Sequence, residues 1–314
     1  MCIRDRWHLA PITLACIAIV FFSLIHSKYC LIIVVVDEKR LIKLEYLSIL
    51  ELNGKGSFEL LQGQITSDME KVSERNCALG AICDVKGRTI GSFVTAINAE
   101  RDDSYHLIGD KKVLELTMDV LEKYQPFYDT KMSIEDQYQF FGIKKDLLKD
   151  MFPESNLDKS FENNDLFSRV HYLEKEFHIV YSTNPKLFEA FEVSLDESAW
   201  KQDEILNLNY EITSEASNKF TPHELGYHLT SRIDFEKGCY TGQEIVARMH
   251  YRAKNLPNII IKTTEKEVKP LSKVFDDNQK SIGLVLMSSA KEGKNLCLLS
   301  MNKNYKEQEI IFSN

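Results

Sequence analysis

The pattern of apolar and polar positions predicts a mixture of strands and helices up to about residue 252. Strands are expected where apolar residues alternate or cluster between turn residues, and helices where they recur every three or four positions. The predicted strands lie at 44–52, 78–84, 89–97 and 105–108, in a strand-rich section at 131–142, and at 177–181. The predicted helices lie at 57–64, 112–124, 147–152, 185–193 and 243–249, and the remainder of the polar stretch 144–170 is expected to be a surface excursion.

The pattern changes after Leu256-Pro257, where short apolar runs follow one another with no strong helical stripe between them. Short strands at fairly even spacing are typical of a small β-barrel. We therefore predict an α+β region at residues 37–252 and a C-terminal β-barrel at residues 253–314. The predicted barrel strands lie at 258–262, 272–275, 281–287, 295–301 and 309–312.

The first 36 residues do not fit this organisation. An apolar stretch at 9–25 follows two arginines, as in a signal peptide or a short membrane anchor. Pro11, the lack of a clean small-residue cleavage site and the polar residues 26–28 argue against both interpretations. The opening MCIRDR also looks like translated adapter sequence. We therefore expect residues 1–36 to be a mis-called start, with a membrane-anchored interaction protein as the alternative if the segment is genuine.

Length and charge limit the function classes. A chain of 314 residues and 36.3 kDa is long enough for two or three compact units, and its 44% hydrophobic and 27% charged residues are ordinary for a soluble protein. The net charge of −8 argues against a large nucleic-acid-binding surface, because binding to phosphates needs clustered cations. No direct nucleic-acid binding is expected.

The seven cysteines form no CxxC pair, and their number is odd. Neither a disulfide framework nor a zinc site is indicated by such a pattern. Cys77 and Cys83 are interpreted as core thiols of a strand-rich segment. This cysteine usage fits a reducing compartment, so a cytoplasmic location is expected.

The octet KGCYTGQE at residues 237–244 is the most informative short stretch of the sequence. Gly238 and Gly242 allow a sharp turn or a close backbone approach. Cys239 lies just ahead of a predicted helix and two residues from Lys237, a position that favours the thiolate. From the residues alone, Cys239 is interpreted equally well as a functional thiol or as a small buried residue in a tight turn.

Further motifs extend the octet into a family resemblance. These motifs are a front motif, LQGQITSD at 61–68; a second motif, CDVKGR at 83–88; FTPHE at 220–224 with IDF at 233–235; and VAR at 246–248 with YR at 251–252. From about Leu44 to the C-terminus the sequence resembles the YgfZ family, folate-binding relatives of the glycine-cleavage aminomethyltransferase, GcvT. The resemblance implies a cloverleaf in which two interleaved α+β units surround a central channel and a C-terminal β-barrel closes one side.

The same resemblance implies a function. A YgfZ-like protein is expected to bind tetrahydrofolate or a one-carbon folate derivative and to support the assembly or repair of iron–sulfur proteins, including enzymes that thiolate tRNA. It is expected to be a monomer and an accessory factor rather than an enzyme. The alternative is a folate-dependent aminomethyl or methyl transferase, which would need an acidic residue near the transferred carbon.

Particular residues are assigned roles by this resemblance, each with a plainer alternative. Cys239 and Lys237 would form a functional thiol with its cation, although Lys237 could also simply lie in solvent. Trp200 falls where the family lines its folate site and could stack on the ligand or only pack in the core. The remaining candidates for the folate site are the octet residues Gly238, Tyr240, Gln243 and Glu244. Of these, Gln243 and Glu244 could instead cap a helix.

Two other features bear on ligand contact. His223, His228 and His250 are near the octet in sequence and could supply a base to the thiol, although such histidines more often lie on the surface of a helix or loop. The sequence ILNL at 205–208 replaces the Ile-Glu-x-Gly-like element that follows the tryptophan in the family, and it lacks both the acid and the glycine. Altered folate contacts are therefore expected.

Overall fold

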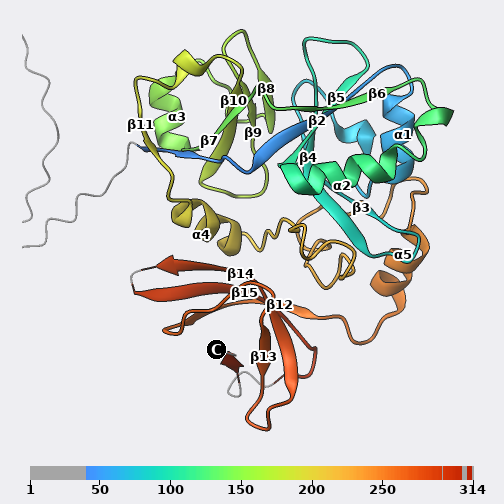
Figure 1. Ribbon diagram of the computed structural model, residues 1–314, viewed down its shortest axis with the longest axis vertical. Coiled ribbons are helices and arrows are strands. Elements are labelled where there is room, and N and C mark those ends of the chain that lie inside the picture. The colour runs from blue at the N-terminus through green and yellow to red at the C-terminus, as the bar shows by residue number, and fades with distance from the viewer. Residues whose placement is uncertain (1–39, 292, 306–309, 313–314) are drawn as a thin grey trace, which may run out of the picture. The chain divides into compact units, whose positions relative to one another are not determined.

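The computed structural model describes residues 40–291, 293–305 and 310–312 (Figure 1). The prediction for residues 1–36 lies outside these ranges. Within them, no helix combines the length and the apolar composition that a membrane span requires.

A five-stranded antiparallel sheet is built from one continuous stretch of chain, in the order β3-β4-β5-β2-β6. Its strand β2, which lies between β5 and β6, is almost wholly buried, as its leucine and isoleucine residues predict. The strands are β2 (Leu47–Asn53), β3 (Ala78–Cys83), β4 (Thr89–Ile97), β5 (Ser104–Asp110) and β6 (Lys131–Glu135).

Helices α1 (Ser57–Gln64) and α2 (Lys111–Leu121) belong to the core of this sheet. Helix α2 begins where Asp110 accepts a hydrogen bond from the amide of Val113 at 3.2 Å, and its apolar stripe contacts β2 and β4. Burying each leucine of such a stripe contributes about 2 kcal/mol to the free energy of unfolding. Two short 3₁₀ turns, Met69–Lys71 and Gln125–Phe127, complete this unit.

A six-stranded sheet is assembled from two separate parts of the chain, in the order β11-β1-β7-β10-β9-β8. Strand β1 precedes the five-stranded sheet in sequence, yet it pairs with β7 and, in parallel, with β11. The two sheets are therefore interleaved along the chain. The elements are β1 (Arg40–Lys43), β7 (Gln139–Lys144), α3 (Lys145–Met151), β8 (Phe161–Asn163), β9 (Ser168–Val170), β10 (Phe177–Ser182) and β11 (Glu192–Ser194).

The two sheets share one hydrophobic core. Ile49 and Ile108 of the five-stranded sheet belong to the same buried cluster as Phe140 and Ile179 of the six-stranded sheet. Trp200, from helix α4 (Ser198–Leu206), belongs to this cluster as well. The core therefore places α4 beside the junction of the two sheets.

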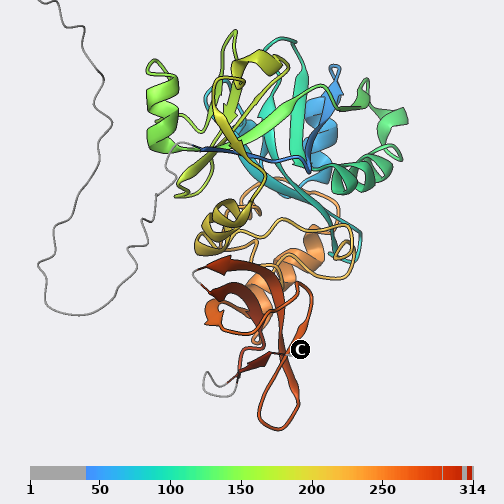
Figure 2. The ribbon, with the colours of Figure 1, turned by 60° about the vertical axis from the view of Figure 1, so that its left-hand side comes forward.

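The C-terminal strands form a curled five-stranded sheet in the order β12-β15-β14-β13-β16 (Figures 1 and 2). It has its own core, which includes Val274, Val285 and Leu299. Helix α4 packs against β14, where the Ser289 hydroxyl donates to the Ser198 carbonyl at 3.0 Å. The strands are β12 (Asn258–Thr264), β13 (Lys273–Phe275), β14 (Ser281–Lys291), β15 (Lys294–Met301) and β16 (Ile311–Phe312).

The predicted fold class is confirmed: the chain is α+β, with interleaved units and a curled C-terminal sheet. Two local predictions are wrong. The helix predicted at 185–193 is a single 3₁₀ turn, Pro185–Leu187, followed by β11, because pairing of Glu192 with Arg40 of β1 draws this segment into the sheet. The polar stretch 144–170 also contributes β8 and β9, which complete the six-stranded sheet.

Candidate functional site

The octet forms a tight turn that leads into helix α5 (Gln243–Arg252). Gly242 caps the helix with φ +84°, a left-handed conformation that favours glycine. A Cβ at this position would lie 2.4 Å from the carbonyl oxygen of Asp84, so only glycine fits without displacement of the backbone. Gly87 faces the same junction and also has a positive φ. The second motif, residues 83–88, therefore packs directly against the octet.

The front motif, residues 61–68, is held by the octet from another side. The Lys237 ammonium donates to the backbone carbonyls of Gln62, Ile65 and Ser67, each at 2.8 Å. The Thr241 hydroxyl adds a hydrogen bond to the side chain of Gln64, also at 2.8 Å. The three motifs, far apart in sequence, thus form one structural unit.

Lys237 is the centre of this unit. The side chain is buried, with 8% of the residue exposed, and burial lowers its pKa to about 8 although Asp68 and Asp234 favour the charged form. Its three donors match the three carbonyls that surround it. The structure therefore contradicts the interpretation of Lys237 as a solvated cation and gives it a clamping position.

Cys239, in contrast, lies on the surface. The thiol is exposed, and a Cβ at the neighbouring Gly238 would have no atom within 4 Å. Glu244 is exposed in the first turn of α5, whereas Tyr240 is buried beneath the turn with its ring 5.4 Å from the Lys237 ammonium. The interpretation of Cys239 as a buried turn residue is wrong, and a functional thiol stays a prediction.

The three histidines near the octet contact one another. The ring of His223 lies 4.9 Å from that of His228 and 5.9 Å from that of His250, and His250 stacks on Phe235 at 3.7 Å. Burial, with a smaller contribution from the other two histidines, lowers the pKa of His223 to about 4. Among the described residues no histidine forms a hydrogen bond with Cys239. The cluster is an aromatic stack at the C-terminal end of α5, which carries His250.

Trp200 is buried, with 2% of the residue exposed. Its indole nitrogen donates to the Tyr46 hydroxyl at 3.0 Å, and the Phe177 ring meets it edge-on at 6.1 Å. A Cβ at Gly142 would lie 2.9 Å from the indole, so the six-stranded sheet approaches the ring closely. The Lys175 ammonium lies 3.5 Å from the indole centroid, within the range of a cation–π contact.

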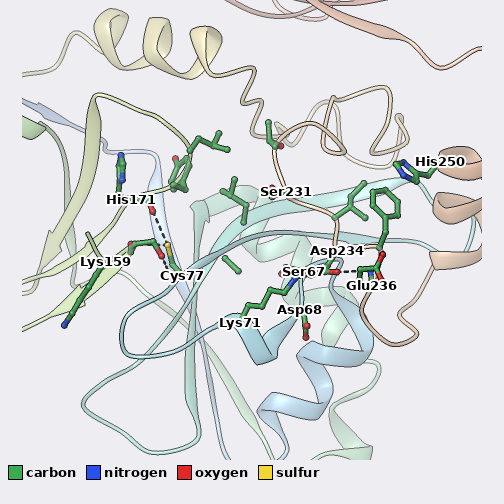
Figure 3. A pocket seen from close by; sticks show the side chains of 18 of the residues that line it. Ser67, Asp68, Lys71, Cys77, Lys159, His171, Ser231, Asp234, Glu236 and His250 are labelled. Atoms are coloured by element: carbon green, nitrogen blue, oxygen red, sulfur yellow. Dashed lines mark hydrogen bonds and ion pairs between the residues drawn. The ribbon is translucent and has the colours of Figure 1, made fainter. Parts of the chain in front are cut away.

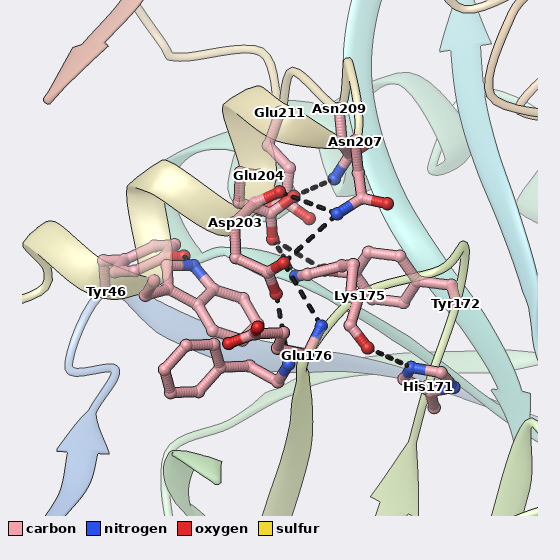
Figure 4. A network of polar contacts seen from close by, with 12 residues as sticks. Tyr46, His171, Tyr172, Lys175, Glu176, Asp203, Glu204, Asn207, Asn209 and Glu211 are labelled. Atoms are coloured by element: carbon pink, nitrogen blue, oxygen red, sulfur yellow. Dashed lines mark hydrogen bonds and ion pairs between the residues drawn. The ribbon is translucent and has the colours of Figure 1, made fainter. Parts of the chain in front are cut away.

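Lys175 also belongs to a buried polar network (Figure 4). It forms an ion pair with Glu204 of α4 and donates to the Tyr172 hydroxyl at 3.3 Å. The Tyr172 hydroxyl in turn donates to Glu204 at 3.1 Å, and Asn209 donates to the other carboxylate oxygen. Glu204 is therefore saturated with donors, which compensates for its removal from water.

A second ion pair extends the network. The fully buried Arg232 donates to the side-chain oxygen of Asn209 at 3.0 Å and to the carbonyl oxygens of Gly80 and Phe93, and it lies 3.5 Å from the Glu211 carboxylate. Burial raises the pKa of Glu211 to about 7, although Arg232 favours its charged form.

A cavity of about 330 Å³ borders Trp200, which we call the Trp200 cavity. Acidic side chains dominate its polar wall, and apolar side chains form the rest. The carboxylate of Glu211 faces a space large enough for a planar heterocycle. Its lining comprises Tyr46, Asp110, Glu197, Trp200, Lys201, Glu204, Glu211, Ile212, Thr213 and Met287.

A larger cavity of about 920 Å³ borders the polar network (Figure 3). Tyr172 lines this cavity, while its hydrogen-bond partner Glu204 lines the Trp200 cavity. The ion pair between Lys71 and Asp234 lies in the wall, and Phe235 and His250 form one end. Tyr172 and Glu204 therefore form part of the partition between the two cavities.

The structure separates the predicted site residues into two groups. Trp200 lines the Trp200 cavity, whereas the octet residues Gly238, Cys239, Tyr240, Gln243 and Glu244 line neither cavity. The roles predicted for these octet residues in ligand binding stay predictions. In the described part of the chain, no group of three or more His, Cys, Asp or Glu side chains is placed to hold a metal ion.

Sequence reasoning missed the charged residues around Trp200. Lys175 lies in a polar loop, and nothing in its neighbourhood distinguishes it from an exposed lysine. Glu204, Glu211 and Arg232 carry no motif either. The sequence did indicate the altered ILNL element, and there Leu208 keeps a left-handed backbone, φ +54°, at the position where the family pattern has glycine.

Comparison with known proteins identifies similar chains. No protein-family model matches the sequence. The tRNA-modifying protein YgfZ of Aliivibrio fischeri is 27% identical over 243 residues, which are 75% of this chain and 74% of that protein. The tRNA-modifying proteins YgfZ of Colwellia psychrerythraea and Vibrio vulnificus are 27% and 24% identical over 69% and 78% of this chain, and the match covers the same shares of those proteins.

The fold has a counterpart among solved structures. The glycine cleavage system aminomethyltransferase T from Bartonella henselae superposes with a TM-score of 0.68, covering 88% of this chain and 82% of that one, at 12% sequence identity. This likeness concerns the fold, while the three sequence relatives named above bear the YgfZ name. The resemblance inferred from the motifs is therefore confirmed: the sequence is similar to those of YgfZ proteins, and the fold is similar to that of the aminomethyltransferase.

Proposed function

We propose that this protein binds tetrahydrofolate or a one-carbon derivative and acts as an accessory factor in tRNA modification. The names of the sequence relatives support the link to tRNA modification. The shared fold supports a folate ligand. The observation that carries the proposal is the acid-lined Trp200 cavity at the junction of the two sheets.

The chemistry of this cavity fits one edge of a pterin. A 2-amino-4-oxo pterin presents neighbouring N–H donors, and a carboxylate accepts such a pair well. Glu211 lines the cavity, and among the described residues its ion pair with Arg232 at 3.5 Å is its one recorded polar contact. Asp110 offers a second carboxylate in the same wall. These residues would hold the ring, and folate would supply the one-carbon chemistry.

The same acids orient the ligand. The glutamate tail of a folate is anionic, so Asp110, Glu197 and Glu211 would repel it from the cavity. The tail would therefore extend toward solvent while the ring enters. The negative wall would thus exclude the anionic tail of the folate and accept its pterin ring.

The octet would serve a different step. Cys239 is exposed on a turn that Lys237 and Gly242 fix in place, which suits a thiol that must meet a partner protein. We propose that iron–sulfur proteins, such as tRNA-thiolating enzymes, are the clients of this surface. Folate binding and client contact would then occupy separate parts of the molecule.

Titration with tetrahydrofolate, followed by Trp200 fluorescence in the full chain with Trp7→Phe, tests the folate proposal. Glu211→Gln should weaken binding about tenfold, because it removes the charged acceptor. Cys239→Ala should leave affinity unchanged but abolish rescue of tRNA thiolation in cells that lack their own YgfZ protein. Absence of binding by the folded protein would overturn the folate proposal, and rescue by Cys239→Ala would overturn the role of the thiol.

A further inference from the structure

The cavity of about 920 Å³ has no part in the proposed folate site, although it is the larger of the two cavities. Figure 3 shows Lys159 and His171 at one end of it and Asp234, Glu236 and His250 at the other. The second end is built by the segment that leads into the octet and by the last residues of α5. A ligand that fills this cavity must therefore suit two different ends.

Carboxylates dominate the charged part of the wall. Of its two lysines, Lys71 already forms an ion pair with Asp234. The hydrogen bond to Asp234, with smaller contributions from the charges of Asp68 and Glu236, raises the pKa of Lys71. These three carboxylates therefore surround one ammonium, and this end keeps an excess of negative charge. The charged side chains of the wall are Asp68, Lys71, Asp158, Lys159, Asp234 and Glu236.

Two hydroxyl groups of the same wall are not used by the protein. Ser67 and Thr230 line the cavity with 3% and 2% of their residues exposed, and neither hydroxyl forms a hydrogen bond within the described part of the chain. A buried hydroxyl without a partner is costly, and a hydroxyl can accept a hydrogen bond as well as donate one. Together with the carboxylates, these groups give the wall a surplus of acceptors. The ligand that fits such a wall is rich in N–H donors.

We propose that this cavity binds an aliphatic polyamine, a methylene chain that carries two or more ammonium groups. An ammonium group only donates hydrogen bonds, and its charge complements the carboxylates. Asp158 precedes Lys159 in the chain, so a carboxylate is present at each end of the cavity, as an extended cation requires. This inference goes beyond the proposed function and does not depend on it.

The uncharged part of the wall suits the rest of such a ligand. Apolar side chains bury methylene groups, and aromatic rings attract ammonium groups. The rings of Phe235 and His250 stack at 3.7 Å, and Tyr251 meets Phe235 edge-on at 6.1 Å, so the aromatic surface is held in place. The apolar and aromatic members of the wall include Leu79, Leu173, Ile233, Phe235 and Tyr251.

A lysine-rich segment of a protein carries the same ammonium groups, but it suits the wall less well. Each peptide unit of such a segment adds a carbonyl acceptor, and this wall already has more acceptors than donors. A polyamine adds donors without adding acceptors. The observations therefore favour the small molecule.

The test is isothermal titration calorimetry of the full chain with spermidine at about 150 mM salt, where long-range attraction is screened. The double variant Asp158→Asn/Glu236→Gln removes one carboxylate at each end of the cavity. Both residues are exposed, so the fold should persist, which circular dichroism checks. The matched control, Glu122→Gln/Asp277→Asn, changes the net charge equally at exposed residues outside the cavity.

The parent should bind one spermidine, the double variant should bind it about tenfold more weakly, and the control should match the parent. Amide NMR shifts on binding should be largest at residues 230–236. Absence of binding, or equal weakening in the double variant and the control, would overturn the inference, because only general attraction to an acidic protein would then be present. Tighter binding of acetyl-trilysine amide than of spermidine would overturn the polyamine in favour of a basic protein segment. None of these outcomes bears on tetrahydrofolate binding, which is measured separately.

Discussion

The octet and the Trp200 cavity hold a buried lysine in opposite ways. In the octet, Lys237 donates to three neutral carbonyls of the front motif and so joins the two segments of backbone. Beside Trp200, Lys175 contacts a carboxylate and two aromatic rings, all of them side chains. A cation held by backbone carbonyls fixes the position of the chain segments it joins, whereas a cation held by side chains holds those side chains in place. The exposed Cys239 belongs to the first arrangement and the proposed pterin site to the second.

The largest effect should follow the loss of the Lys237 ammonium. Lys237→Met would leave three carbonyls without their donor, which should lower the free energy of unfolding by about 3 kcal/mol. Urea denaturation measures this change. Lys71→Met is the control, because Lys71 is mostly exposed and its ion pair with Asp234 should contribute less than about 1 kcal/mol. Equal losses in the two variants would contradict the clamping position of Lys237.

The two glycines of the octet sharpen the comparison within the motif itself. Gly242→Ala places a methyl group 2.4 Å from a carbonyl oxygen at φ +84° and should cost about 2 kcal/mol of stability. Gly238→Ala meets no atom within 4 Å and should change stability by less than about 0.5 kcal/mol. Thermal denaturation of the pair reports the difference. A large loss in Gly238→Ala alone would show that the turn is oriented differently.

The smallest effect concerns the pH dependence of the interior. Burial raises the pKa of Glu211 to about 7, above the usual value of a glutamate, so the folded state binds the proton more tightly than the unfolded state. The stability from this group is present below about pH 4.5 and is lost as the pH rises through 7. Glu211→Gln should remove this decline, because a glutamine side chain does not titrate. Denaturation curves from pH 5 to 8 measure it, and parallel curves for both proteins would contradict the shift.

The part of the molecule that the sequence predicts well is the part with repeating or motif signals. The alternation in 78–97 predicts the β3–β4 hairpin, and helix α1 occupies the predicted residues 57–64. The motifs also predict correctly that the octet begins a helix. These signals are local, so each can be interpreted without knowledge of the rest of the chain.

The part that could not be predicted depends on contacts between distant residues. In the sequence, Lys175 and Glu204 resemble surface residues. In the structure, the β9–β10 connection packs against α4 and both residues are excluded from water. The segment 185–193 resembles a helix until β1 pairs with β11. In both places the local structure depends on a contact with residues remote in sequence, so local propensity and periodicity do not reveal it.

Strand β1 has a consequence for synthesis of the protein. Leu41 pairs with Val193, which is made about 150 residues later. At ordinary rates of translation this interval is roughly 8 to 30 s. During that time the whole five-stranded sheet, whose strands end at Glu135, can emerge and fold. Leu41 and Ile42, which are buried in the folded protein, are not yet covered by all the residues that bury them. The six-stranded sheet, whose strand β1 is made before the five-stranded sheet β2–β6, is therefore completed after it.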